Sequence, residues 1–127
     1  MLAFYSAILF SILILVIISF QIALAAGKPW GEYAMGGKYP GRFPLPLRIG
    51  AVIQAFILLG IGLIVLIRAK MILSFWYSFS ETAIWFVAGF TVLGTVLNLI
   101  TPSKKERMIW GPVSILLLIS SLIVAFS

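Results

Sequence analysis

Few residues of this chain could take part in acid–base, nucleophilic or metal chemistry. The sequence contains no histidine and no cysteine, and its three acidic residues are Glu32, Glu81 and Glu106. Zinc sites of cysteine and histidine, histidine-ligated haem and thiol chemistry are therefore excluded. Membrane enzymes that act on lipids usually need several acids, histidines or a metal. We therefore predict no catalytic residue, no metal and no cofactor; a lipid-modifying enzyme is the weakest alternative.

Polar and aromatic side chains gather instead in one segment, residues 27–47, which holds five glycines and four prolines. A loop of this length is usually functional or disordered. Disordered segments contain few aromatic residues, whereas this one has four, so we expect it to fold back as an ordered lid. Its candidate ligand-binding residues are Lys28, Trp30, Glu32, Tyr33, Tyr39, Arg42 and Arg48.

Three kinds of site compete with a purely structural role for this loop. The basic residues could clasp an anionic head group while the aromatic rings anchor the lid. The amides of Gly36 and Gly37 could form an anion-binding nest, although the spacing of a nucleotide-binding loop is absent. Glu32 could act as a single acid opposite Arg42 or Arg48.

The rest of the chain consists of long apolar segments. Hydrophobic residues make up 63% of the sequence and charged residues 9%, and the mean hydropathy is +1.23. Soluble domains have about 45–50% apolar and about 25% charged residues, and an apolar helix of about 20 residues crosses a bilayer. We therefore predict an all-α, polytopic membrane protein, with residues 1–127 forming one bundle of four transmembrane helices. The predicted helices cover residues 2–26, 48–68, 79–100 and 106–126.

Two serine–glutamate pairs predict where the last two helices begin. Ser78 with Glu81, and Ser103 with Glu106, have the S-x-x-E spacing of a capping box, in which each side chain satisfies a backbone amide. Capping therefore explains both glutamates, and a functional carboxylate at Glu81 is the alternative. Pro112 either kinks a fourth helix that starts just after Ser103 or lies in the first turn of a shorter spanning helix.

Small and polar residues inside the spans predict helix–helix contacts, because lipid offers no hydrophobic drive for association. The third span carries such residues at three- and four-residue spacing on one helical face: Ala88, Thr91, Thr95 and Asn98. Gln54 and Asn98 should each find an interhelical partner, because an unpaired amide is costly in hydrocarbon. A polar ligand site is the alternative interpretation.

Basic residues are spread unevenly over the connections between the spans. Seven of the nine lysines and arginines fall in the first and third connections, and two, Arg68 and Lys70, fall in the second. The positive-inside rule then predicts a cell-membrane protein with loops one and three in the cytoplasm and both termini outside. The net charge of +6 indicates contacts with anionic lipid head groups and not with nucleic acid.

The first loop also carries a family pattern. Gly27-x-Pro29-Trp30-Gly31, followed by Gly36-Gly37, Pro40-Gly41, Pro44 and Leu47-Arg48, resembles the first loop of a group of small, uncharacterised bacterial four-helix membrane proteins. The resemblance covers this loop and the starts of its flanking helices, and the remainder is similar only in hydropathy. It implies the four-helix membrane fold and brings no activity with it.

These observations predict a non-enzymatic membrane protein that binds a lipid, another small amphiphile or a membrane partner beneath the lid. The bilayer is its first partner, and a second membrane protein or a second copy of the chain is a further one. A dimeric small-molecule transporter is the alternative. Four-helix exporters of this size typically place a carboxylate in the first helix, and residues 2–26 carry no charge.

Overall fold

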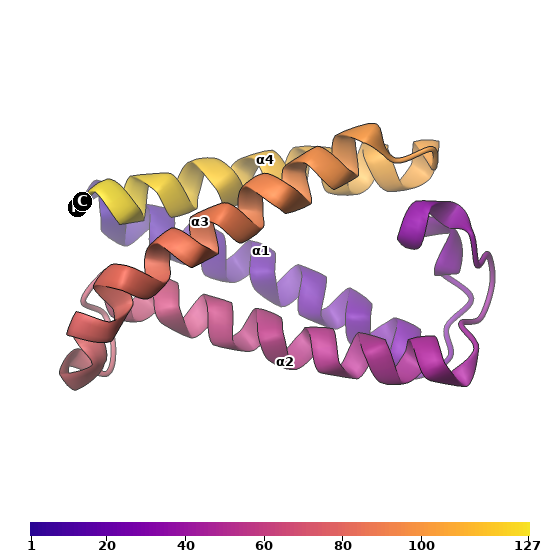
Figure 1. The fold of residues 1–127 in the computed structure, drawn as a ribbon, viewed down its shortest axis with the longest axis horizontal. Coiled ribbons are helices and arrows are strands. Elements are labelled where there is room, and N and C mark those ends of the chain that lie inside the picture. The colour runs from indigo at the N-terminus through magenta and orange to yellow at the C-terminus, as the bar shows by residue number, and fades with distance from the viewer.

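The computed structural model describes residues 1–127 and contains four long helices (Figure 1). The helices are α1 (Leu2–Ala25), α2 (Leu45–Arg68), α3 (Tyr77–Ile100) and α4 (Lys104–Phe126). Three short 3-10 turns lie in the connections: η1 (Gly31–Tyr33), η2 (Met35–Gly37) and η3 (Ser74–Trp76). All four helices are long and apolar enough to cross a membrane, so the predicted all-α architecture with four spans is confirmed.

The first helix, α1, contains no glycine or proline and is rich in leucine, isoleucine and alanine, which favours an unbroken helix. It ends at Ala25, one residue before the predicted end, in a Schellman motif. The Lys28 amide donates to the Ala23 carbonyl at 3.0 Å, and the Gly27 amide donates to the Leu24 carbonyl at 3.1 Å. Gly27 has the left-handed φ of +93° that this motif needs, which is why glycine suits the position.

The starts of α2 and α3 differ from the prediction. α2 begins at Leu45, three residues early, because Pro46 fits the first turn, where a helix needs no N–H donor. α3 begins at Tyr77, directly after η3 and two residues before the predicted start. Ser78 therefore lies inside the helix, exposed and without a capping bond, and the predicted capping box with Glu81 is wrong.

The start of α4 confirms the other predicted cap in part. The Ser103 hydroxyl accepts the amide of Glu106 at 3.2 Å, as expected of an N-cap. The Glu106 carboxylate does not return to Ser103 and instead accepts the amide of Gly36, in the first loop, at 3.1 Å. α4 begins at Lys104, two residues before the predicted start, and continues through Pro112, so this proline lies inside a single helix.

The helices form two hairpins, α1–α2 and α3–α4, and α1 also packs against α4. Both termini and the α2–α3 connection lie at one end of the bundle, here named the packed end (Figure 1). The first loop and the α3–α4 connection lie at the opposite end, here named the lid end. From the packed end to the lid end, α3 diverges from α2 and follows α4 (Figure 1).

The hydrophobic core lies toward the packed end and takes residues from all four helices. Polar contacts between α3 and α4 continue it: the Thr91 and Ser121 hydroxyls are 3.2 Å apart, and the Thr95 hydroxyl donates to the Ser114 carbonyl at 3.1 Å. The predicted stripe on α3 therefore packs against α4 at these threonines. The core residues are Ala7, Phe10, Ile14, Leu58, Ile61, Val65, Ile84, Val87, Leu117, Val124 and Ala125.

Arg68, the last residue of α2, connects the ends of three helices at the packed end. Its guanidinium donates to the carbonyls of Ala125 and Ser127 at 3.3 and 2.8 Å. It also donates to the Tyr77 hydroxyl, at the start of α3, at 3.0 Å. Hydrogen bonds from a charged donor are stronger than neutral ones, and carbonyls at a helix C-terminus attract a cation. Arg68 therefore joins the end of α2 to the start of α3 and to the end of α4.

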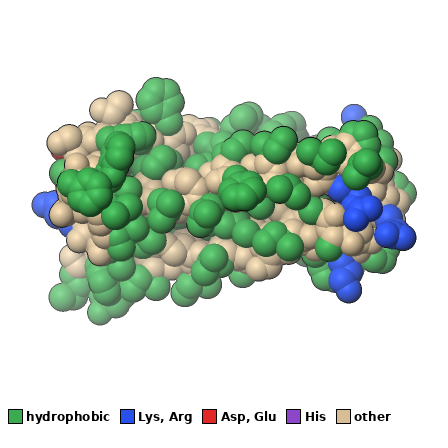
Figure 2. Space-filling model, turned by 90° about the horizontal axis from the view of Figure 1, so that it is seen from below, with side chains coloured by type: hydrophobic (Ala, Val, Ile, Leu, Met, Phe, Trp, Pro, Cys, Tyr) green, Lys and Arg blue, Asp and Glu red, His purple; other side chains and the backbone are tan.

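The outer surface is apolar along the length of the bundle, and the basic side chains gather at its two ends (Figure 2). More of them lie at the lid end, where the first and third connections meet. This distribution suits helices surrounded by hydrocarbon, with their charged ends at the level of the head groups.

Candidate functional site

The first loop folds back over the lid end as expected, and residues 26–44 are named the lid below. Gly31 is the buried centre of the lid, and its amide donates to the Gly41 carbonyl at 2.9 Å. A Cβ atom at position 31 would overlap the Tyr39 carbonyl oxygen and would lie 2.8 Å from the Gly41 oxygen. Only glycine therefore allows the two arms of the lid to approach this closely.

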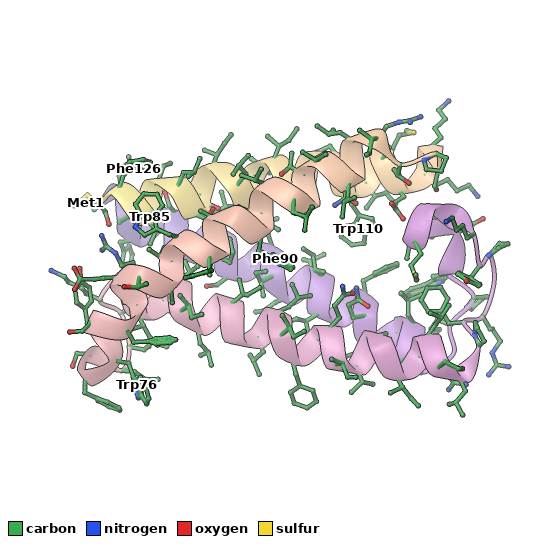
Figure 3. The ribbon with its side chains drawn as sticks, viewed as in Figure 1. Met1, Trp76, Trp85, Phe90, Trp110 and Phe126 are labelled. Atoms are coloured by element: carbon green, nitrogen blue, oxygen red, sulfur yellow. The ribbon has the colours of Figure 1, made fainter.

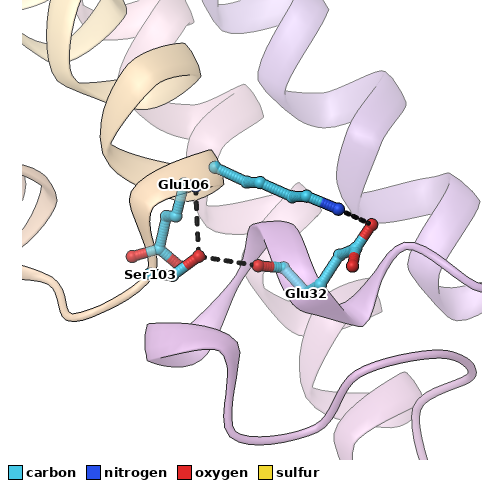
Figure 4. A network of polar contacts seen from close by, with 4 residues as sticks. Glu32, Ser103 and Glu106 are labelled. Atoms are coloured by element: carbon cyan, nitrogen blue, oxygen red, sulfur yellow. Dashed lines mark hydrogen bonds and ion pairs between the residues drawn. The ribbon is translucent and has the colours of Figure 1, made fainter.

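Backbone groups of the lid are bonded to the start of α4. The Ser103 hydroxyl donates to the Glu32 carbonyl at 2.9 Å (Figure 4), and the indole N–H of Trp110 donates to the Tyr33 carbonyl at 3.0 Å. Figure 4 also shows the Ser103 hydroxyl accepting the amide of Glu106. One serine therefore caps α4 and fastens the lid.

Glu32 forms the only ion pair in the structure, with Lys105 of α4 at 3.1 Å (Figure 4). The two side chains are 39% and 59% exposed, so water screens the pair and its contribution to stability is small. The hypothesis of an acid opposite Arg42 or Arg48 is therefore wrong, because the lid turns Glu32 toward α4.

A cavity of about 970 Å³ lies between the helices below the lid. Buried residues of α1 and α4, such as Ile14 and Leu117, form its floor and are 3% and 7% exposed. Residues of α2 and α3 that line it are open to the outside; Ile53 is 56% and Leu93 is 57% exposed. The cavity therefore opens sideways between α2 and α3, where the two helices diverge.

Lid residues and the start of α4 form the roof of the cavity, including Tyr33, Gly36, Glu106 and Trp110. The Trp110 ring packs against Phe20 of α1, with ring centroids 4.9 Å apart, and both rings line the cavity. Figure 3 shows Trp110 directed from α4 toward the interval above α2. The roof is therefore polar and aromatic, whereas most of the remaining lining is apolar.

The two amide side chains singled out in the sequence have different partners. Gln54 of α2 accepts a hydrogen bond from the Gln21 side chain of α1 at 2.9 Å, which is the predicted interhelical contact. Asn98 donates to the Gly94 carbonyl of its own helix at 2.8 Å and lines the cavity. The expected interhelical partner of Asn98 is therefore absent, because α2 has moved away from α3 at this level.

Of the seven predicted ligand residues, Tyr33 alone lines the cavity. Trp30 stacks on Phe20 with centroids 6.4 Å apart, and Tyr39 packs edge-on against Phe43 with centroids 6.3 Å apart. These aromatic residues anchor the lid to α1 and to itself, as the composition of the loop predicted.

Three predicted basic residues lie together on the outside of the lid end. A Cβ atom at Gly27 would lie 2.9 Å from an Arg42 nitrogen and 3.4 Å from an Arg48 nitrogen, so the two guanidinium groups are neighbours. Arg48 donates to the Ala25 carbonyl at 2.8 Å, and neither arginine is paired with a carboxylate. With the exposed Lys28 nearby in sequence, they form the outer basic surface.

Sequence reasoning missed Glu106 and Trp110 as site residues. Glu106 is 7% exposed and lines the cavity beside Trp110, whereas the S-x-x-E spacing predicts only a cap there. The two residues are four positions apart and therefore share one helical face, which was the available signal. No group of three or more His, Cys, Asp or Glu side chains comes together in the structure. The arrangement is suited to holding an apolar molecule by its body and a polar group at its end.

Comparisons of the chain with protein-family models, with curated proteins and with solved structures find no match. The resemblance of the first loop to small bacterial four-helix membrane proteins therefore stays a prediction. Function has to be inferred from the geometry of the cavity and the lid.

Proposed function

We propose that the chain is a multi-pass membrane protein that binds an amphiphile, such as a membrane lipid, with the apolar part of the ligand in the cavity below the lid. The observation that carries this proposal is the cavity itself, which has a volume of about 970 Å³ and a mostly apolar lining. Sites for small molecules are typically concave, mostly apolar and about 300–1,000 Å³ in volume.

The side on which the cavity opens supports a ligand that comes from the bilayer. Ile53 and Ile57 of α2, and Leu93 and Leu97 of α3, line the mouth and are at least half exposed. In a membrane these side chains face hydrocarbon, so an acyl chain enters without crossing water. An empty cavity forfeits dispersion contacts, which favours its occupation by such a chain.

The lid end supplies charge at the level of the lipid head groups. Arg42 and Arg48 lack carboxylate partners, which suits contacts with the anionic head groups of lipids around the bundle. Seven of the nine basic residues lie in the connections at this end or in the first turns of the helices that follow them. On the positive-inside rule, the lid then faces the cytoplasm and both termini lie outside.

Filling the cavity tests the proposal. Gly94 of α3 lines the cavity, and no atom lies within 4 Å of the position that a Cβ would take there. The ring introduced by Gly94→Phe therefore enters the cavity and should displace the ligand. Gly89, also on α3, has equally open surroundings and does not line the cavity. Gly89→Phe is the matched control.

Native mass spectrometry from a mild detergent measures the amphiphile that stays bound. We expect the wild type and Gly89→Phe to retain a lipid or amphiphile and Gly94→Phe to lose it. A wild type that retains nothing, or a Gly94→Phe variant that retains as much as the wild type, would contradict the proposal.

A further inference from the structure

Glu106 is the only acidic side chain that lines the cavity, and it is 7% exposed. Its Oε2 atom accepts the Gly36 amide at 3.1 Å, whereas its Oε1 atom makes no hydrogen bond within the chain. The only buried side-chain nitrogen or oxygen without a partner is Nε of Arg68, so Oε1 keeps accessible surface. Both Glu106 and its partner Gly36 line the cavity, so this carboxylate lies at the roof. One carboxylate oxygen is therefore available to a ligand.

No basic side chain of the protein neutralises this carboxylate. Lys105 pairs with Glu32 and not with Glu106, although it is the neighbour of Glu106 in sequence. Its Nζ atom lies 3.1 Å from Oε1 of Glu32 and 5.7 Å from the centroid of the Tyr33 ring. Lys38 also lines the cavity but forms no ion pair. The Gly36 amide gives the carboxylate one hydrogen bond but no counter-charge, and an enclosed charge without a counter-charge is costly. A cation carried by the ligand would be that counter-charge.

Aromatic rings surround the same end of the cavity. Trp110 follows Glu106 by one helical turn on the same face of α4. The Phe20 ring packs against the Trp110 ring, and Tyr33 lines the cavity from the lid. The bond from the Trp110 indole to the Tyr33 carbonyl, 3.0 Å long, fixes the ring in place. The faces of aromatic rings attract cations, and quaternary ammonium groups are commonly bound among such rings.

We infer that the cavity selects amphiphiles whose head group carries an amine or a quaternary ammonium, and that Glu106 binds this charge among Trp110, Phe20 and Tyr33. The inference rests on the proposed function, because it names the head group of the ligand whose apolar part fills the cavity. An anionic head group is repelled by Glu106 and belongs at the outer basic surface. A free amphiphilic amine and a choline lipid share the required chemistry.

Three probes of equal chain length test the inference and separate these two sources. Dodecyltrimethylammonium is a free cation, lysophosphatidylcholine with a twelve-carbon chain carries the ammonium on a lipid head group, and dodecanol is uncharged. Each is titrated against the full-length protein in maltoside detergent, and native mass spectrometry gives the bound fraction. If the free cation binds more tightly than the lysolipid, the ligand is a free amphiphilic amine. If the two bind equally, the ligand is a lipid with an ammonium head group.

Glu106→Gln is the decisive variant, because the glutamine oxygen still accepts the Gly36 amide and the lid stays fastened. The matched control is Glu81→Gln, which removes the same charge from an exposed position near the packed end. Phe20→Leu is a second variant, which keeps apolar volume and removes one ring. Unchanged dodecanol binding shows that each variant has folded and kept its cavity.

We expect the wild type and Glu81→Gln to bind the cation at least about tenfold more tightly than dodecanol, because the enclosed carboxylate attracts the ammonium charge and the aromatic faces add cation–π contacts. Glu106→Gln should reduce this preference to about twofold or less, and Phe20→Leu should reduce it by roughly threefold. A wild type without preference, or a preference that survives Glu106→Gln, would overturn the inference and leave the proposed function intact. Failure of all three probes to bind would overturn both.

Discussion

At the packed end of this bundle, Val65 and Ile84 are completely buried among the helices, and Arg68 bonds to the last residues of α4. At the lid end, α2 and α3 diverge, and a cavity of about 970 Å³ lies beside a small buried cluster of Leu24, Phe43 and Ala51. Hydrogen bonds to the backbone of the lid, from Ser103 and Trp110, close that end. With the proposed binding in the cavity, this difference separates stability from binding along the bundle axis.

If this separation is correct, substitutions at the packed end change the free energy of unfolding and leave ligand retention unchanged. Substitutions in the lid change ligand retention more than they change stability.

The largest effect is expected from Ile84→Ala at the packed end. Ile84 is 0% exposed, and truncating a buried isoleucine to alanine costs about 2–5 kcal/mol. The same change at Ile53, 56% exposed at the mouth of the cavity, should stay within about 0.5 kcal/mol of the wild type. Unfolding titrations in mixed micelles measure both free energies. Equal costs would show that the two ends are packed alike.

Arg68→Ala should have the next largest effect on stability. It removes the bonds to the carbonyls of Ala125 and Ser127, and hydrogen bonds of charged groups are worth about 1.5–3 kcal/mol. Lys70→Ala, which removes an exposed cation whose Nζ atom lies 5.3 Å from the centroid of the Tyr77 ring, is the control and should cost at most about 1 kcal/mol. The same titrations measure the loss, and native mass spectrometry should find ligand retention unchanged. Loss of the ligand in Arg68→Ala would contradict the separation of the two ends.

Gly31→Ala should act on the lid. Its Cβ would overlap the Tyr39 carbonyl, so the arms of the lid must separate, at a cost of about 1–3 kcal/mol. We expect faster hydrogen exchange of the lid amides and loss of the bound amphiphile, with unchanged exchange in the core helices. Gly60→Ala, in open space on α2 and outside the cavity, should change neither. A Gly31→Ala lid that remains protected would show that the close approach is not needed.

The smallest effect is expected from Glu32→Gln, which removes the exposed ion pair with Lys105 and keeps the Glu32 carbonyl that Ser103 binds. Ser103→Ala removes that bond and the cap of α4, and loss of an N-cap costs about 0.5–2 kcal/mol. Thermal unfolding should therefore show a lower Tm for Ser103→Ala than for the wild type, and an almost unchanged Tm for Glu32→Gln. The reverse order would mean that the ion pair fastens the lid.

The number and approximate position of the helices could be predicted because each span is a continuous apolar run of sufficient length. Their ends depend on local geometry that sequence patterns describe less well. The 3-10 turn Ser74–Trp76 starts α3 early and leaves Ser78 inside the helix, whereas Ser103 has an extended backbone and does cap. The same S-x-x-E spacing therefore predicts a cap correctly in one place and wrongly in the other.

The candidate site was predictable only in its outer part. The aromatic and glycine content of residues 27–47 predicts an ordered lid, because both are local properties. The cavity arises from the divergence of α2 and α3, which depends on how whole helices cross and leaves no local signature. For the same reason, the sequence could not show that Asn98 would face a cavity or that Glu106 would reach Gly36.

If the cavity binds an amphiphile as proposed, the position of its mouth between α2 and α3 determines how the ligand enters. A site that opens sideways exchanges molecules with one leaflet by diffusion in two dimensions. Its occupancy then follows the mole fraction of the amphiphile in that leaflet and not its concentration in water. A weak affinity of the cavity for the amphiphile is then sufficient for high occupancy, because partitioning into the membrane has already concentrated the amphiphile beside the mouth. A protein that binds its ligand in this way would respond to the composition of its own membrane.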